Sequence, residues 1–390
     1  MISTATKAAE DCRSPKASPE MGPLCFRRFL FGVPALGGPL WSRAARYRRL
    51  NRLKAELRTK SNCETPSVLR CFRACTTRTA VVALLTLTAC SGEHGNPLQS
   101  KFFSHVEIIG TRGTGLGQLN KPRSLAVDLQ DNLYVVDMTG RVQKFSPAGE
   151  YLLSWQMPQT DLGKPKGMTR DRSGNILVVE PHYSRVNHFA PHGTLVTQWG
   201  RHGTNAGQLG LPRSVAVNSK GDIFVSEYGA TERIQRFSSN DHRLLGTIGK
   251  FGTVDGEFNR AEGVAIDRND RLYVADSCNH RVQVFSPEGK FLRTSGKPGS
   301  GPEDLSYPYD VCVDADGQQF VCEFGNSRIH VFDSAGRSIE VIGGPGSSPG
   351  KFNNPWSIAL DSHGNLYVAD SGNHRVQKLV RKQTFSSTRQ

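Results

Sequence analysis

The sequence lacks the patterns that define several large classes of protein. Its 390 residues contain no Gly-X-Y period, no sustained apolar heptad and no apolar run near the roughly 20 residues that a membrane-spanning helix needs. The metal-binding patterns His-Glu-x-x-His and a paired-cysteine zinc spacing are missing as well. Collagens, coiled coils and multi-span membrane proteins are therefore excluded, and a large soluble domain fits the composition best.

Positive charge gathers at one end of the chain. The formal net charge of +14 suggests a nucleic-acid partner until it is divided along the sequence. Residues 1–90 hold 16 Lys and Arg against 5 Asp and Glu, whereas residues 91–390 hold 33 against 30. The body of the protein is nearly neutral, which argues against nucleic acid as its partner.

The first ninety residues have the composition of a targeting region. Residues 1–67 are rich in Arg, Pro, Ser and Ala without a periodic apolar face, and we interpret them as disordered or as an over-extended gene model. Residues 68–89 place three arginines before the apolar stretch Ala80 to Ala89, which is the layout of a signal peptide and is too short to span a membrane. A chance apolar run before a domain is the alternative.

The end of this segment, Leu87-Thr88-Ala89-Cys90, resembles the lipobox of bacterial lipoproteins. The resemblance implies that Cys90 is lipidated and becomes the first residue of the mature chain. We therefore expect an exported protein that meets the membrane only through a lipid anchor, or that is periplasmic or extracellular. Residues 90–101 would then form a linker.

Six copies of one module fill most of the remaining sequence. They align on one arginine, and successive arginines are 44, 48, 48, 47 and 47 residues apart. The fourth copy reads GVAIDRNDRLYVADSCNHRVQVFSPEGKFLRTSG, with four short β-rich runs separated by turn residues. A four-stranded antiparallel sheet repeated about every 45 residues is typical of a β-propeller.

The two ends of the repeat region complement each other. The sixth copy stops after its third strand, near Leu379, while SHVEIIGTRGTGLGQLNKP before the first copy matches TLVTQWGRHGTNAGQLGLP at the end of the second. We predict that the strand Val106 to Ile109 completes the sixth blade and closes the ring. The sequence thus indicates an all-β, six-bladed β-propeller over residues 102–380, followed by a disordered tail over 381–390.

The repeated pattern resembles the NHL repeat. Pro-x-Ser/Gly-apolar-Ala-Val-Asp, followed by Gly-Asn-Leu-Tyr-Val-Ala-Asp-Ser-Gly-Asn-His-Arg-Val-Gln, is nearly complete at Pro355 to Gln377 and well kept at Gly263 to Gln283. NHL repeats fold as six-bladed propellers, and the family includes translational repressors, ubiquitin-ligase substrate modules, bacterial secreted and sensor domains, and a lyase that releases amidated peptides. The resemblance therefore implies the fold but leaves the function open.

An acid and an arginine recur in every copy. The acid ends the second strand, and the arginine follows four to six residues later. A device repeated in this way predicts a structural ion pair that holds the loop, rather than a ligand site. The pairs are Asp137 with Arg141, Glu180 with Arg185, Glu227 with Arg233, Asp276 with Arg281, Glu323 with Arg328, and Asp370 with Arg375.

The position after the proline at the start of each first strand varies from blade to blade. Blades one to three present cations there, and blades four to six present a carboxylate and two aromatic rings. We expect these side chains to share one mouth of the ring and to suit a ligand with an anionic end and an apolar or sugar-like face. Ordinary variation at a solvated rim is the alternative. The candidate residues are Arg123, Lys166, Arg213, Glu262, Tyr309 and Trp356.

Cysteine and histidine give no clear metal site. Cys312 and Cys322 lie on neighbouring strands of the fifth blade and would form either a disulfide or two free buried thiols. Histidines 182, 280 and 374 occupy equivalent loops of alternate blades, about 120° apart around the ring by its six-fold arrangement, so they should not converge on a metal. We expect no metal and no cofactor.

Together these features favour a non-catalytic binding or scaffold module. We expect an exported, lipid-anchored propeller that binds a protein, peptide or glycan at one mouth of the ring. The alternative is a metal-dependent lyase or lactonase on a six-bladed propeller, and the sequence alone does not decide whether the protein is an enzyme.

Overall fold

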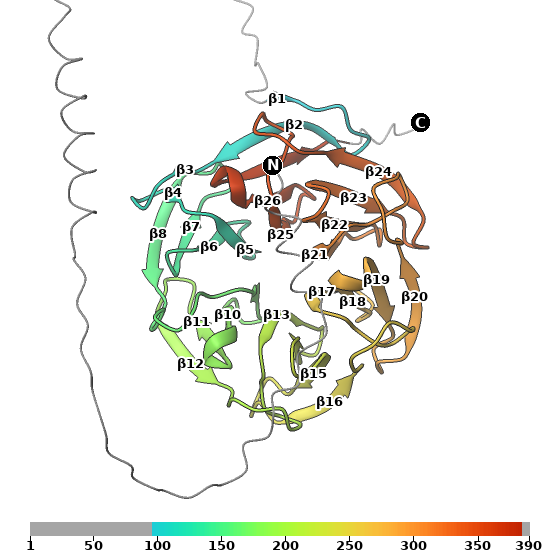
Figure 1. Ribbon diagram of the computed structural model, residues 1–390. Coiled ribbons are helices and arrows are strands. Elements are labelled where there is room, and N and C mark those ends of the chain that lie inside the picture. The colour runs from blue at the N-terminus through green and yellow to red at the C-terminus, as the bar shows by residue number, and fades with distance from the viewer. Residues whose placement is uncertain (1–95, 384–390) are drawn as a thin grey trace, which may run out of the picture. The chain divides into compact units, whose positions relative to one another are not determined.

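The computed structural model describes residues 96–383. Six antiparallel sheets follow one another around a central axis, as Figure 1 shows, so the six-bladed β-propeller is confirmed. The expected extension over residues 1–67, the signal peptide over 68–89, Cys90 and the end of the tail from residue 384 lie outside the described residues. Among residues 96–383, no helix is long and apolar enough to cross a membrane.

Each of the first five blades takes its four strands from one continuous segment. The first blade contains β5 (Pro122–Val127), β6 (Leu133–Asp137), β7 (Arg141–Phe145) and β8 (Tyr151–Gln156). The second contains β9 (Met168–Arg170), β10 (Ile176–Glu180), β11 (Arg185–Phe189) and β12 (Leu195–Trp199). The third contains β13 (Pro212–Val217), β14 (Ile223–Glu227), β15 (Arg233–Phe237) and β16 (Leu244–Ile248). The fourth contains β17 (Ala261–Ile266), β18 (Leu272–Asp276), β19 (Arg281–Phe285) and β20 (Phe291–Ser295). The fifth contains β21 (Pro308–Val313), β22 (Gln319–Glu323), β23 (Arg328–Phe332) and β24 (Ser338–Gly343).

The sixth blade joins the two ends of the repeat region. It is built from β25 (Pro355–Leu360), β26 (Leu366–Asp370), β27 (Arg375–Arg381) and the N-terminal β2 (Phe103–Ile109). β2 pairs antiparallel with β27, with Val106 opposite Leu379 and Ile109 opposite Val376. Closure of the ring by the N-terminal strand is therefore as expected from the sequence.

Short elements complete the described part of the chain. β1 (Asn96–Pro97) pairs with the outer edge of β2, although it falls in the segment expected to be a linker. β3 (Thr111–Arg112) and β4 (Gln118–Leu119) form a small parallel ladder in the connection to the first blade. Single 3₁₀ turns follow the second strands of the even-numbered blades: η1 (Pro181–Tyr183), η2 (Ser277–Asn279) and η3 (Ser371–Asn373).

Burial explains the residue pattern of the strands. The second strand of each blade is buried at all five positions, because it has a strand on either side and a neighbouring blade against each face. These strands accordingly contain almost continuous apolar runs, such as LYVAD in β18 and β26. The outermost strands are more exposed, and β12 has four exposed residues out of five.

The core consists of apolar clusters between adjacent blades. Between the third and fourth blades, for example, Phe224 and Ile234 pack with Val274 and Phe285. Burying a side chain of this size stabilises the fold by about 1.5–3 kcal/mol relative to leaving it in water. Because every blade packs against two neighbours, this contact pattern holds the inner strands around the axis, where the candidate site lies.

Candidate functional site

The repeated acids and arginines lie against each other in all six blades. Each carboxylate is buried, while its arginine is largely covered, so the pairs lie within the blades rather than on an open surface. The shortest nitrogen–oxygen distances are 3.5 Å for Asp137–Arg141, 2.5 Å for Glu180–Arg185, 2.6 Å for Glu227–Arg233, 2.8 Å for Asp276–Arg281, 2.5 Å for Glu323–Arg328 and 2.8 Å for Asp370–Arg375.

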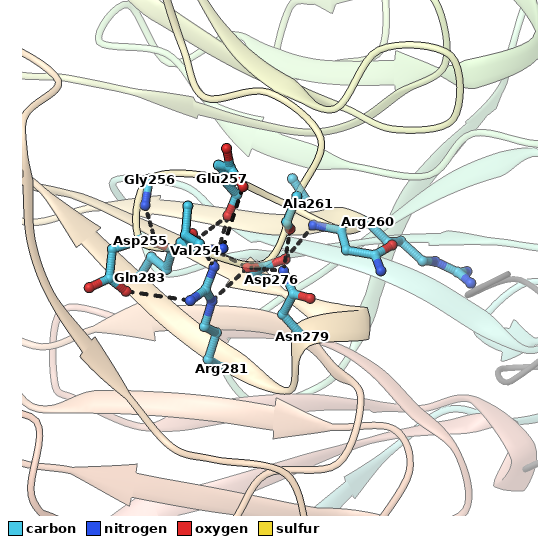
Figure 2. A network of polar contacts seen from close by, with 12 residues as sticks. Val254, Asp255, Gly256, Glu257, Arg260, Ala261, Asp276, Asn279, Arg281 and Gln283 are labelled. Atoms are coloured by element: carbon cyan, nitrogen blue, oxygen red, sulfur yellow. Dashed lines mark hydrogen bonds and ion pairs between the residues drawn. The ribbon is translucent and has the colours of Figure 1, made fainter. Parts of the chain in front are cut away.

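In the fourth blade, Asp276 accepts hydrogen bonds from four donors, of which Asn279, Arg281 and Gln283 are labelled in Figure 2. The backbone N–H of Asn259 donates to Oδ1 at 2.8 Å, and the Asn279 amide donates to Oδ2 at 2.9 Å. Arg281 Nε and Gln283 Nε2 also donate to Oδ2, at 2.8 and 3.1 Å. One buried carboxylate therefore satisfies polar groups from one strand, β19, from the turn that precedes it and from an inter-blade connection.

Arg281 and Gln283 extend this network into the connection that leads to the blade. Arg281 Nη2 donates to the carbonyls of Val254 and Glu257 at 2.8 and 2.9 Å. Gln283 donates to the Glu257 carbonyl at 2.7 Å and accepts from the Gly256 N–H at 2.9 Å (Figure 2). The network therefore fastens an irregular segment to a strand, which is a structural task.

The six residues that follow the proline position converge at the centre of the ring. They lie at or just before the start of the inner strands, of which β5, β13, β17, β21 and β25 are labelled around the axis in Figure 1, and they line a cavity of only about 20 Å³. We call this the cation–aromatic face. Its members are Arg123, Lys166, Arg213, Glu262, Tyr309 and Trp356.

Glu262 is the carboxylate around which the cations of this face gather. Arg213 Nε lies 3.0 Å from Glu262 Oε2, Arg260 Nε lies 2.6 Å from Oε1, and Lys166 Nζ lies 3.8 Å from Oε2. Burial alone would raise the pKa of Glu262, but the charges of Arg213, Lys166 and Arg260 outweigh it and hold that pKa well below its usual range. Burial, aided by the charge of Arg213, lowers the pKa of Lys166 well below its ordinary value.

Aromatic rings cover the remaining cation surfaces. The Arg123 guanidinium lies 4.5 Å from the centre of the Trp356 ring, and Lys166 Nζ lies 4.0 Å from the same ring. Arg213 lies 4.1 Å from the ring of Tyr228. Arg123 has no ion-pair partner among residues 96–383, and burial together with the charge of Arg213 lowers the pKa of Arg123 to about 10. Cations therefore exceed carboxylates in this cluster, and the rings supply part of the compensation.

Two members of the cluster were not anticipated from the sequence. Arg260 and Tyr228 lie outside the repeat position, so the alignment of copies gave no reason to select them. Arg260 precedes Ala261, which replaces the proline present in the other five copies. This departure from the repeat was the one feature of the sequence that could have pointed to Arg260. The Arg260 N–H donates to Glu232 at 2.7 Å, and burial raises the pKa of Glu232 to about 7.

The disulfide alternative for Cys312 and Cys322 is wrong, because both are free thiols. Cys312 lies opposite Phe320, and Cys322 lies opposite Asp310, so the two cysteines are diagonal rather than directly paired. Diagonal residues in an antiparallel pair are about 7–8 Å apart, which exceeds the usual Cα separation of a disulfide. Burial raises the pKa of both thiols well above the ordinary value, so they are also unsuited to nucleophilic chemistry.

The histidines of the equivalent loops serve local contacts. His280 Nδ1 accepts from the Tyr307 N–H at 3.2 Å, and His374 Nδ1 accepts from the Lys121 N–H at 3.3 Å. In the part of the chain that the structure describes, no three His, Cys, Asp or Glu side chains are arranged to hold a metal ion.

These features define a class: a six-bladed β-propeller whose blades repeat one buried acid–arginine ion pair. A family model described as the NHL repeat matches residues 258–285 and 352–379, in the fourth and sixth blades. The chain thus carries NHL repeats.

Curated relatives match parts of the chain. Protein brain tumor of Drosophila melanogaster is 29% identical over 130 residues, which cover 33% of this chain and 12% of that protein. NHL repeat-containing protein 3 of Homo sapiens is 31% identical over 110 residues, which cover 26% of this chain and 31% of that protein. The matched segments therefore span less than a third of these relatives.

Several solved structures share the fold. A gluconolactonase from Xanthomonas campestris superimposes with a TM-score of 0.52 at 16% identity, covering 74% of this chain and 99% of that one. An auxiliary nutrient binding protein from Bacteroides ovatus gives 0.54 at 15% identity, covering 71% of this chain and 76% of that one. Virginiamycin B lyase from Staphylococcus aureus gives 0.50 at 12% identity, covering 70% and 98%. Identities this low show a common fold and nothing about activity.

Proposed function

We propose that this protein is a non-catalytic binding module whose cation–aromatic face receives a protein, peptide or glycan. The observation that carries the proposal is the composition of this face, where Arg123, Lys166, Arg213 and Arg260 lie around Glu262, and a second carboxylate, Asp310, lines the same cavity. Excess positive charge beside aromatic rings attracts acidic groups that carry an apolar or sugar-like flank.

The dimensions of the face support surface contact rather than catalysis. The cavity of about 20 Å³ is far smaller than the roughly 300–1,000 Å³ typical of small-molecule sites. Arg123 and Trp356 are only half-buried, so they are the parts of the cluster that a partner can touch. An arginine and a tryptophan at the centre of a surface are typical of binding hot spots.

The test is a double variant, Arg123→Ala with Trp356→Ala, in the full-length chain. Arrays of peptides and glycans probed with the wild type and the variant should show ligands that lose at least tenfold in affinity, because each residue is of a type whose truncation commonly costs more than 1.4 kcal/mol. Arg213 is a poor choice for this experiment, because its buried bonds to Glu262 would be lost as well.

Arg172→Ala is the matched control, since Arg172 is exposed in the turn between β9 and β10, at the other end of the inner strand. Melting curves should show that all variants are folded. Equal binding by the double variant and the wild type would exclude this face. Near-stoichiometric zinc or calcium in chain purified without chelator would instead favour the lyase or lactonase alternative.

We further propose that the protein is exported and anchored through Cys90, on the signal-peptide layout of residues 68–89. Metabolic labelling with a fatty acid should mark the wild type and not Cys90→Ser, with Cys312→Ser as the labelled control. Detection of any peptide from residues 1–60 in the mature protein by mass spectrometry would contradict cleavage at this site.

A further inference from the structure

A hollow enters the ring from the end opposite the cation–aromatic face. Its outer part has a volume of about 1170 Å³ and its inner part, between the inner strands, about 400 Å³. The two parts are continuous, since Val127, Arg170, Val313 and Leu360 line both. The inner part alone falls within the range of small-molecule sites. We call the two parts together the axial well.

The wall of the axial well is set by the last residue of each inner strand. Five of these six positions are aliphatic and one is an arginine, and all six are partly exposed although they lie on the innermost strands. The exception interrupts the repeat at a single blade, and a residue that departs from the repeat is not needed to build the blade. The six residues are Val127, Arg170, Val217, Ile266, Val313 and Leu360.

Arg170 is held in place by the backbone and not by an acid. Its Nε donates to the carbonyl of Val127 at 3.3 Å and its Nη1 to the carbonyl of Asp171 at 3.4 Å. Among residues 96–383 no carboxylate forms an ion pair with it. The nearby acids are already engaged: Asp128 pairs with Lys144 at 3.0 Å, and Asp171 accepts from the Asn175 amide at 2.9 Å.

The axial well thus combines a guanidinium without an ion pair, that of Arg170, with aliphatic side chains from the five other inner strands. This combination suits a ligand with one negative charge and an apolar body. We propose that the axial well binds a small monocarboxylate with an apolar body, such as a medium-chain fatty acid. The carboxylate would accept the free N–H groups of Arg170 through charge-assisted hydrogen bonds. The apolar chain would lie against Val127, Val217, Ile266 and their neighbours, where each buried methylene adds affinity.

The mouth of the well argues for a single negative charge. Five aspartates line the well at this end, against the three cations Arg170, Arg381 and Lys382. Asp131 and Asp316 have no lysine or arginine partner among the described residues, and Asp314 is shared with Arg381 at 3.3 Å. A polyanion would face repulsion from these aspartates, whereas a monocarboxylate can place its one charge on Arg170 deeper in the well. The inner part of the well shares Ser124, Ser214 and Asp310 with the small cavity at the cation–aromatic face, but Arg170 lies at the other end of the inner strands, and the proposal does not depend on the proposed function.

Isothermal titration of the full-length chain with octanoate, octan-1-ol and inorganic sulfate tests the proposal. Octanoate should bind one to one and at least tenfold more tightly than either of the others, because only octanoate combines the charge with the apolar chain. Arg170→Met keeps the apolar stem and removes the charge, so it should weaken octanoate about tenfold to a hundredfold, to the level of octanol. Arg172→Met, in the adjacent exposed turn, should leave octanoate binding unchanged.

Three results would overturn the proposal: no heat with octanoate at millimolar concentration, equal affinity for octanoate and octanol, or equal affinity for octanoate and sulfate. Octanoate binding that survives Arg170→Met would do so too. If Arg170→Met fails to fold by circular dichroism, the comparison of the three probes on the wild type still decides, and Arg170→Lys should retain part of the preference for octanoate.

Discussion

Replacing Glu262 with glutamine should lower the free energy of unfolding by about 3–5 kcal/mol. Lys166 and Arg213 are both buried, and they lie with Arg260 around this single carboxylate. Removing the negative charge leaves the buried Lys166 and Arg213 packed together in the centre of the ring without the carboxylate that they share. The amide of glutamine preserves size and shape, so the loss would report the charge rather than a cavity.

The loss should depend on pH in a defined direction. Because the folded-state pKa of Glu262 is lowered, its carboxylate contributes stability that is present above the unfolded-state pKa near 4.5 and is lost as the pH falls below that value. The difference in stability between the wild type and Glu262→Gln should therefore shrink between pH 5 and pH 3, as read from urea unfolding curves.

Glu288→Gln is the matched control, since Glu288 is fully exposed in a turn of the same blade. It should leave the unfolding curve at pH 7 almost unchanged. If Glu262→Gln is as stable as the wild type, Glu262 does not balance the cluster, and its cations must be neutral or compensated elsewhere. The cation–aromatic face would then lose the charge on which its proposed ligand preference rests.

The repeat pattern predicted the blades and their number, but it did not predict which side chains from different blades come into contact. Six aligned copies gave the blade, the number of blades and the closure by the N-terminal strand, because each depends on periodicity alone. The alignment also indicated that Glu262 and Arg213 share one end of the ring. It could not show that they bond directly, since they belong to different blades, or that Arg260 joins them.

The sequence also did not predict the register between neighbouring strands or the side chains that surround a given residue in the closed ring. The repeat placed Cys312 and Cys322 on neighbouring strands and left a disulfide open, but the register of those strands puts the two cysteines on a diagonal. Arg170 was not predicted as a site residue, because what distinguishes it is its position among five aliphatic residues in the closed ring. Those neighbours come from five different blades and are far from Arg170 in sequence.

Replacing Asp276 with alanine should also lower the free energy of unfolding by about 3–5 kcal/mol. The substitution leaves Arg281, Gln283, Asn279 and the Asn259 N–H without their common acceptor in a buried site (Figure 2). Asp255→Ala is a matched control, because Asp255 also pairs with Arg281, at 3.4 Å, but is 61% exposed. Removing that exposed partner should cost less than about 1 kcal/mol.

Asp276→Asn separates the two contributions that this carboxylate makes. Burial raises the pKa of Asp276 above its ordinary value even though four donors point at it, so ionising it within the blade is itself costly. We therefore expect hydrogen bonding, rather than net charge attraction, to carry most of the effect, and asparagine, which keeps an acceptor oxygen, should recover a substantial part of the stability lost in Asp276→Ala. Equal losses in the two variants, measured by urea unfolding at pH 7, would mean that the charge of Asp276 is what holds Arg281. Since all six blades contain this pair, the answer determines whether the repeat is fastened by satisfied polar groups or by ion pairs.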